Sequence, residues 1–145
     1  MEDTPQTDLD DLADTTVSGK GKINSVTVHI NARAGGTVAQ TGAYTRKKTN
    51  GTAHNGSEIT LDNNYTDYYT EYTTNPYTTE PWTWAEIMGS TILVPAIDPL
   101  QAGVGLRRSS GIGANKESRC TQVWVVIDYT PATLESYKEV THETV

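Results

Sequence analysis

Residues 75–87 read Asn-Pro-Tyr-Thr-Thr-Glu-Pro-Trp-Thr-Trp-Ala-Glu-Ile and lie between runs that have the pattern of β-strands. Thr83 and Glu86 have the spacing of a capping box, in which a hydroxyl and a carboxylate satisfy each other's backbone amides. The prolines keep the approach extended. We therefore predict a short helix over residues 84–88 that ends at Gly89 and acts as a structural brace. The predicted structural anchors are Trp82, Thr83, Trp84, Glu86 and, on a later strand, Trp124.

Most of the remaining chain has the two-residue period of half-buried strands. The predicted strands cover residues 23–33, 37–46, 57–61, 65–73, 103–108 and 119–129, with a brief apolar run at 91–94 and a polar loop at 47–55. The strand at 119–129 is apolar on both faces, which favours a central position in its sheet. About seven short strands and one helix predict an all-β fold, an antiparallel β-sandwich or jelly roll with extended termini. We divide the chain into an acidic N-terminal arm (1–20), a β-sandwich domain (21–131) and a C-terminal tail (132–145).

The composition limits the core and the classes of partner. Hydrophobic residues make up 35% of the 145 residues, and there are 8 Tyr and no Phe. This predicts a thin core that gains stability from neighbouring subunits. The net charge of -7 argues against a general nucleic-acid binder. No apolar run has the length of a membrane span, and the acidic N-terminus does not resemble a signal peptide, so we expect synthesis in a host cytoplasm without secretion.

Charge is segregated along the chain. Residues 1–14 carry six acidic residues and no basic one, whereas residues 15–57 carry six basic residues and no acidic one. The acidic residues are Glu2, Asp3, Asp8, Asp10, Asp11 and Asp14. The segment is either a solvated acidic tail or an arm that docks on the basic surface of the same or an adjacent subunit. We favour the inter-subunit arm.

The residue types that carry chemistry are scattered. His29, His54 and His142 fall on a strand, a loop and the tail, without zinc-ligand spacing. Cys120 lies at the start of an apolar strand, which is typical of a buried structural thiol rather than a nucleophile. The acidic run 8–14 lacks the central Gly and the final Glu of a calcium-binding loop. Residues 62–67, which are also rich in side-chain oxygens, do not match that pattern either. We therefore predict no catalytic residue, metal or cofactor, and no enzyme.

Aromatic residues gather before and within residues 75–87. The tyrosines of this cluster are Tyr65, Tyr68, Tyr69, Tyr72 and Tyr77. Exposed rings could stack on the sugars of a glycan, but cross-strand aromatic pairing and a subunit interface explain the same pattern. These alternatives stay open from the sequence.

Four segments together resemble structural proteins of tailed phages and related viruses. They are residues 23–28 (Ile-Asn-Ser-Val-Thr-Val), residues 75–87, residues 100–106 (Leu-Gln-Ala-Gly-Val-Gly-Leu) and residues 119–129 (Arg-Cys-Thr-Gln-Val-Trp-Val-Val-Ile-Asp-Tyr). In that group an Asn-Pro-x-Thr…Trp-Thr turn leads to a Gly-Val segment and a closing Thr-Gln-Val-x-Val strand. This chain departs from the group at residues 88–99, which resemble an inserted hairpin or contact loop. Its N-terminal part is also short, so the arm or a neighbour could supply an edge strand.

The resemblance implies a non-enzymatic β-sandwich component of the virion. The expected function is that of a capsid decoration (cementing) protein, a homotrimer that stabilises the shell through contacts with its own copies and with the major capsid protein. The alternatives are a carbohydrate-binding module of a tail fibre, which would bind host-surface glycans, and a tail or connector protein. We expect neither nucleic acid nor membrane as a partner.

Overall fold

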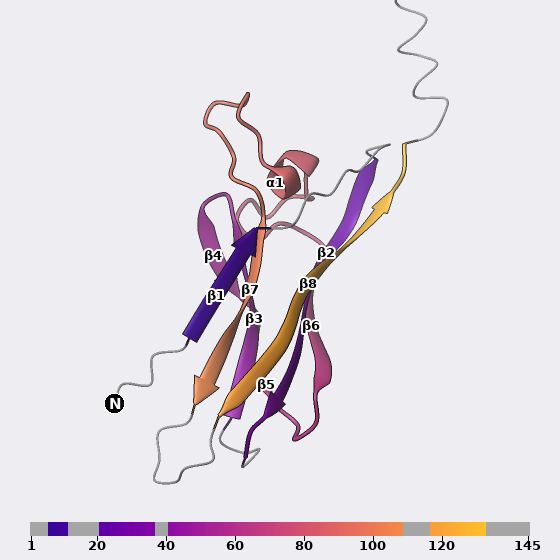
Figure 1. Cartoon of the computed structure of the whole chain (residues 1–145). Coiled ribbons are helices and arrows are strands. Elements are labelled where there is room, and N and C mark those ends of the chain that lie inside the picture. Colours follow the sequence, from indigo (N-terminus) through magenta and orange to yellow (C-terminus); the bar gives the residue numbers. More distant parts are fainter. Residues whose placement is uncertain (1–5, 12–20, 37–40, 109–116, 133–145) are drawn as a thin grey trace, which may run out of the picture.

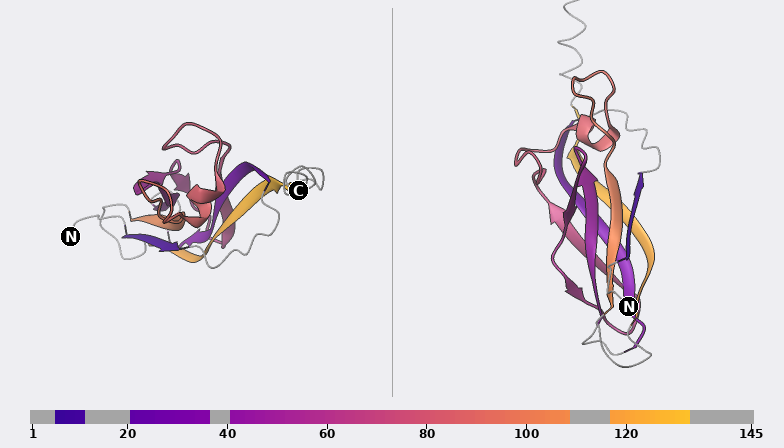
Figure 2. Two further views of the ribbon diagram at one scale, coloured as in Figure 1. Left: turned by 90° about the horizontal axis from the view of Figure 1, so that it is seen from above. Right: turned by 90° about the vertical axis from the view of Figure 1, so that its left-hand side faces the viewer.

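The computed structural model describes residues 6–11, 21–36, 41–108 and 117–132. In chain order the elements are β1 (Gln6–Asp11), β2 (Lys22–Ala34), β3 (Thr41–Thr49), β4 (Thr52–Asn55), β5 (Ile59–Thr60), β6 (Thr66–Tyr72), α1 (Trp84–Met88), β7 (Gln101–Arg108) and β8 (Ser118–Thr130). The prediction of an all-β antiparallel sandwich with one short helix is confirmed. The two sheets run along the long axis, and α1 lies at one end (Figures 1 and 2).

Sheet A has the order β1-β7-β3-β4, with β5 also paired to β3, and sheet B has the order β6-β2-β8. All pairs are antiparallel. The prediction that residues 119–129 form a central strand is wrong, because among the described residues β8 pairs only with β2. The central strand of sheet B is β2, whose inward Val26, Val28 and Ile30 are fully buried. Both faces of β8 are apolar for another reason: one covers the core, and Trp124 on the other stacks on His29.

The predicted polar loop at residues 47–55 is wrong. β3 continues to Thr49, turns through Asn50 (φ 50°) and Gly51 (φ 77°), and returns as β4, so the segment is a tight hairpin. An Asn-Gly pair suits this turn because both central residues need positive φ. A strand was not expected here because its inward-facing residues are polar. These residues are Thr45, Lys47 and Thr49.

The core consists of two apolar clusters. The first lies around Ile30, Ala43, Leu61 and Val104, and the second, at the α1 end, is made of Ile23, Val26, Trp82, Ile87 and Leu100. Between them the hydroxyls of Thr45 (β3) and Thr70 (β6) form a hydrogen bond of 2.6 Å from one sheet to the other. The thin core predicted from the composition is thus divided by polar residues.

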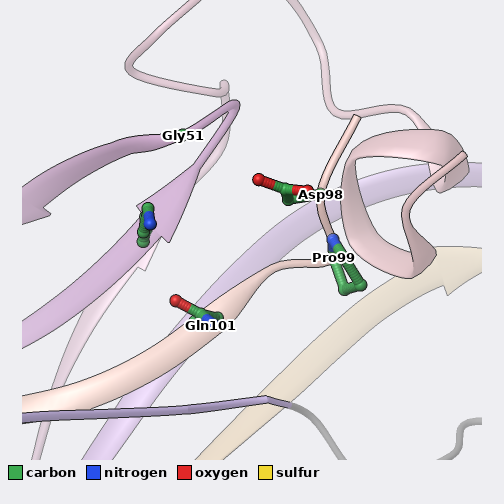
Figure 3. Close-up of a pocket in the computed structure, with 5 residues that line it drawn as sticks. Gly51, Asp98, Pro99 and Gln101 are labelled. Carbon is green, nitrogen blue, oxygen red and sulfur yellow. The ribbon is translucent and has the colours of Figure 1, made fainter. Parts of the chain in front are cut away.

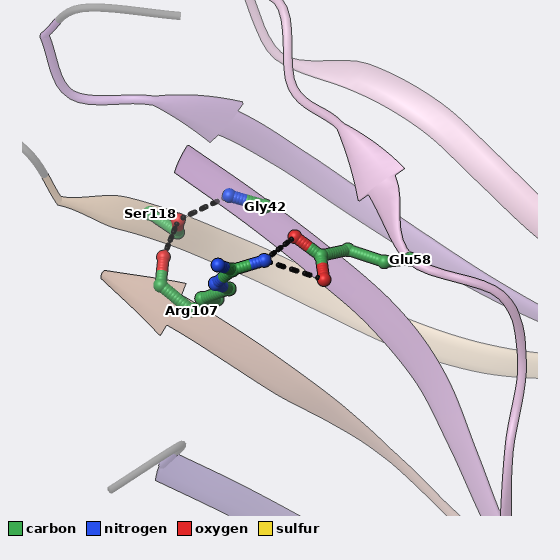
Figure 4. Close-up of polar contacts among 4 residues, drawn as sticks. All are labelled: Gly42, Glu58, Arg107 and Ser118. Carbon is green, nitrogen blue, oxygen red and sulfur yellow. Dashed lines mark hydrogen bonds and ion pairs between the residues drawn. The ribbon is translucent and has the colours of Figure 1, made fainter. Parts of the chain in front are cut away.

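Ser118 joins the sheets at the end opposite α1 (Figure 4). Its hydroxyl donates to the Arg107 carbonyl oxygen on β7 at 2.5 Å and accepts from the Gly42 amide on β3 at 3.3 Å. In the same region Arg107 forms a bidentate ion pair with Glu58, at 2.6 and 2.8 Å. Both of these side chains are exposed, so we expect the ion pair to contribute little to stability.

Candidate functional site

The α1 end of the sandwich is braced as the sequence predicts. Thr83 is the N-cap of α1, and it forms both halves of a capping box with Glu86. The indole Nε1 of Trp82 donates to the Tyr72 carbonyl oxygen at 3.0 Å, and that of Trp84 donates to the Gly21 carbonyl oxygen at 2.7 Å. These bonds attach the helix to the end of β6 and the start of β2. Trp82, Thr83, Trp84 and Glu86 therefore have a structural role: they hold α1 in place.

Asn75 connects this brace to the β3–β4 hairpin. Its side chain is fully buried, and the amide Nδ2 donates to the Thr49 hydroxyl at 3.0 Å and to the Glu86 carboxylate. Its Oδ1 accepts from the Tyr77 amide at 2.9 Å, which closes an Asx turn. Glu86 is buried but well satisfied, because its other oxygen accepts from the amide and hydroxyl of Thr83 at 2.9 Å.

Residues 90–97, which we call the tip loop, project from this braced end (Figure 1). Ser90 and Ile97 exchange two backbone hydrogen bonds of 2.7 and 2.8 Å at the base of the loop. Leu100 then donates its amide to the Ile87 carbonyl oxygen at 3.0 Å, which fixes the loop's exit against α1. Gly89 enters the loop with φ 76°, and a Cβ there would lie 2.9 Å from Pro99. The base of the tip loop is thus held by the brace.

The tip itself is apolar and exposed. Ile92 is 90% exposed, Leu93 45% and Val94 99%, and the Val94–Pro95 peptide bond is cis. Scattered apolar side chains are normal on a surface, whereas these three are consecutive and lie on a loop whose base is held. Residues 89–99 form a loop closed by an isolated bridge rather than a hairpin of two strands, and the contact role expected for residues 88–99 stays a prediction.

A shallow pocket lies below the tip loop, between the β3–β4 turn and the start of β7 (Figure 3). It has a volume of about 280 Å³ and is lined by Lys48, Gly51, Asp98, Pro99 and Gln101. A lysine and a carboxylate both face it. The pocket places a small charged recess beside the apolar tip.

Lys47 is the most unusual side chain of the interior. It is fully buried on β3, its Nζ has no hydrogen-bond acceptor among the described residues, and it lies 2.8 Å from the ring centroid of Tyr72. Burial lowers the pKa of Lys47 to about 7. The same environment lowers the pKa of His54, through burial and the nearby Lys47 charge, and burial raises the pKa of Tyr72. Because Lys47 is sealed from solvent, a substrate could not reach its amine.

The tyrosine cluster divides into two buried-side and three exposed members, of which Tyr68, Tyr69 and Tyr72 lie on β6. Tyr68 and Tyr72 pack against the core, and the Tyr68 hydroxyl accepts from the Asp62 amide at 2.9 Å. Tyr65, Tyr69 and Tyr77 are exposed. Core packing therefore accounts for the two inward tyrosines, and only the exposed ones remain available to a partner.

Trp124 and His29 lie in a row with Tyr69 across the outer face of sheet B. The ring centroids of His29 and Trp124 are 4.9 Å apart and nearly parallel, and those of His29 and Tyr69 are 5.4 Å apart. His29 Nδ1 also contacts the Asp67 carboxylate at 3.1 Å. The prediction of His29 as a polar-face strand residue is confirmed. The row itself could not be predicted, because it depends on the strand register.

The other predicted chemical residues have structural surroundings. Cys120 is half-buried against the first core cluster, its thiol donates to the Gln122 carbonyl oxygen at 3.3 Å, and burial raises its pKa. His54 was expected in an exposed loop but is half-buried on β4, so that prediction is wrong. Within the described ranges, no three His, Cys, Asp or Glu side chains gather as metal ligands would. His142 lies outside these ranges.

Part of the acidic arm belongs to the sandwich. Asp8, Asp10 and Asp11 fall on β1, which pairs with β7 of the same subunit, Asp8 opposite Val104 and Asp11 opposite Gln101. β1 is an edge strand of sheet A, which confirms the expectation that the arm could supply an edge strand, although its residue range was not predicted. Glu2, Asp3 and Asp14 lie outside the described residues, as do 133–145 of the C-terminal tail. The reach of the arm to a neighbouring subunit stays a prediction.

Comparison of the chain with protein-family models, curated proteins and solved structures found no match. In the part of the chain that the structure describes, no helix is long and apolar enough to cross a membrane.

Proposed function

We propose that the protein is a non-enzymatic structural subunit of a tailed-virus particle, and that it decorates the capsid. The tip loop carries this proposal. Its three consecutive apolar side chains face solvent on a base fixed by α1, so docking them would bury apolar surface at a small cost in loop ordering. The resemblance of residues 23–28, 75–87, 100–106 and 119–129 to virion proteins supports the particle context.

In this proposal the tip loop inserts into an apolar recess of a shell subunit. Binding that occurs only on the assembled shell stabilises the shell by mass action. The acidic arm would add contacts with a neighbouring subunit, while β1 keeps part of it on its own sandwich. The contact requires no catalytic group.

The test is binding to emptied capsid shells of the encoding virus, measured by co-sedimentation. The double variant Ile92→Ser/Val94→Ser removes the most exposed apolar residues of the tip. If each contributes about 1.5 kcal/mol or more on burial, affinity should fall more than about a hundredfold. Tyr65→Ser, an exposed residue at the far end of the sandwich, is the matched control and should bind as the wild type does. Undiminished binding by the double variant, or no binding by the wild type, would refute the proposal.

A glycan-binding fibre module is the second candidate, because Tyr69 is 63% exposed on the open face of sheet B. Its ring packs beside His29 rather than inside the core. Binding on a glycan array that is lost in Tyr69→Ala would favour this function. The inward Tyr68 and Tyr72 are unsuitable for this test, since replacing them would disturb the core.

A further inference from the structure

β8 presents the longest edge in the described part of the sandwich. It has 13 residues and pairs on one side with β2, whereas the edges formed by β1 and β6 have 6 and 7 residues. Natural edge strands are usually protected by short length, by charged side chains or by proline. From Thr121 to Ile127, β8 has neither a charge nor a proline. This edge therefore has the properties of a strand that pairs with another chain.

The side chains on the outer face of sheet B also favour a further strand beside β8. The row formed by Tyr69, His29 and Trp124 stops at Trp124, on the edge strand, with stacked spacing of 4.9 Å between the last two rings. On the same face and strand, Val126 is 46% exposed. A further strand beside β8 would cover Val126 and could add one more ring to the row.

We propose that β8 pairs antiparallel with β8 of a second copy, about a twofold axis at Trp124. Directly opposite residues in antiparallel strands share a face, so a symmetric pair must be centred on a residue rather than between two. With Trp124 opposite its own copy, inward Val123 meets Val125 and outward Gln122 meets Val126. The two three-stranded sheets then form one continuous sheet of six strands.

Charge favours this register over the one centred on Val123. β8 has an extra residue at Thr121 where it pairs with β2, so Arg119 lies on the outer face, opposite Arg33. If the same bulge continues into the new pair, Arg119 of one copy opposes the exposed Asp128 of the other. Centring on Val123 would instead bring Glu117, the present ion-pair partner of Arg119, against Asp128. Like charges directly opposite destabilise a sheet, so the Trp124 register is favoured over the Val123 register, and it alone of the two pairs Arg119 with Asp128.

A second copy fits this edge better than an unrelated peptide, because β8 itself carries both members of each pair that would meet: Val123 with Val125, and Arg119 with Asp128. An isologous contact of this kind gives a dimer or another even-numbered assembly. The trimer expected from the sequence has no such contact and stays a separate prediction. The inference is independent of the capsid proposal, since it concerns self-association of the purified chain.

The test combines mass in solution with disulfide trapping. In a Cys120→Ser background, the variant Gln122→Cys/Val126→Cys places two thiols at sites that should meet across the axis. Within one strand these sites are about 13 Å apart, too far to form a disulfide in the same chain. Mild oxidation should therefore yield a covalent dimer on a non-reducing gel. The matched control is Thr27→Cys in the same background, because Thr27 lies on the same face but one strand away from the edge, and it should not cross-link.

Light scattering or sedimentation should give a dimer for the wild-type chain. Val126→Lys should weaken self-association more than about tenfold, because a charge on the paired edge must lose its water. Since Val126 is already partly exposed, we expect the fold to persist, which circular dichroism can verify. A monomeric wild type, a dimer unaffected by Val126→Lys, or cross-linking of Thr27→Cys as fast as of the double variant would each overturn the proposal.

Discussion

Replacing the buried lysine by methionine should stabilise the protein, and the gain should depend on pH. Lys47→Met keeps an unbranched side chain of similar length but removes the amine. In the folded chain the pKa of Lys47 is about 7, against 10.5 for a free lysine. Between these values the unfolded chain binds a proton that the folded chain does not, so the wild type gains stability as pH rises from about 7 to 10.5.

The size of the effect follows from the same two pKa values. One pKa unit corresponds to about 1.4 kcal/mol, so burying Lys47 costs about 4 to 5 kcal/mol near pH 7. The contact with the Tyr72 ring offsets about 2 kcal/mol of this in a desolvated site. We therefore expect Lys47→Met to raise the free energy of unfolding by about 2 to 4 kcal/mol at pH 7. The difference should shrink by up to about 1.4 kcal/mol per pH unit above pH 7.

Urea denaturation of both proteins from pH 6 to pH 10 measures this difference directly. Lys48→Met is the matched control, because the neighbouring Lys48 side chain is only partly buried and faces outward. We expect a change within about 0.5 kcal/mol for the control. The reasoning fails if Lys47→Met is no more stable than the wild type at pH 7, or if the difference stays constant up to pH 10.

Three further changes test other parts of the structure. Asn75→Ala should lower the free energy of unfolding by about 2 to 4 kcal/mol in urea denaturation, since it leaves buried Glu86 without one hydrogen-bond partner. Thr78→Ala, which removes an exposed hydroxyl, is the control, and an equal loss in both variants would contradict the reasoning. Gly105→Ala should cost about 1 to 3 kcal/mol, because its Cβ would lie 2.0 Å from the Tyr44 ring, and Tyr44→Ser should remove most of that cost. The Cys120 thiol should react with Ellman's reagent at pH 8 at least about tenfold more slowly in the native than in the urea-unfolded chain, because burial raises its pKa; equal rates would argue against this.

Features set by local chemistry could be predicted from the sequence. The helix at 84–88 depends on a cap, a carboxylate three residues later and a following glycine, all adjacent in the chain. The alternation around β2 and β6 predicted those strands within one or two residues. Such signals are sufficient where the nearest partners of a residue are its neighbours in sequence.

Features set by distant partners were missed. Lys47 lies inside the sandwich because it alternates in phase with the buried Thr45 and Thr49 on β3, whereas its polarity led to the prediction of a loop. The alternation of the tyrosines predicted two faces but not which face was buried, because that depends on where sheet A lies. The row of His29, Trp124 and Tyr69 depends on the registers of β2 with β8 and β6. The arm was expected as one possible source of an edge strand, but the range of β1 and its pairing with β7 depend on a strand far along the chain and were not predicted.

The polar layer between the two apolar clusters has a consequence for how the molecule loosens. Thr45 and Thr70 separate the cluster under α1 from the one around Ile30, so contacts in one half give little support to the other. We expect the sandwich to open in two cooperative units, which native-state hydrogen exchange would resolve as two groups of amides with different opening free energies. The half that carries the tip loop could then fluctuate, or become ordered on docking, while the other half stays closed.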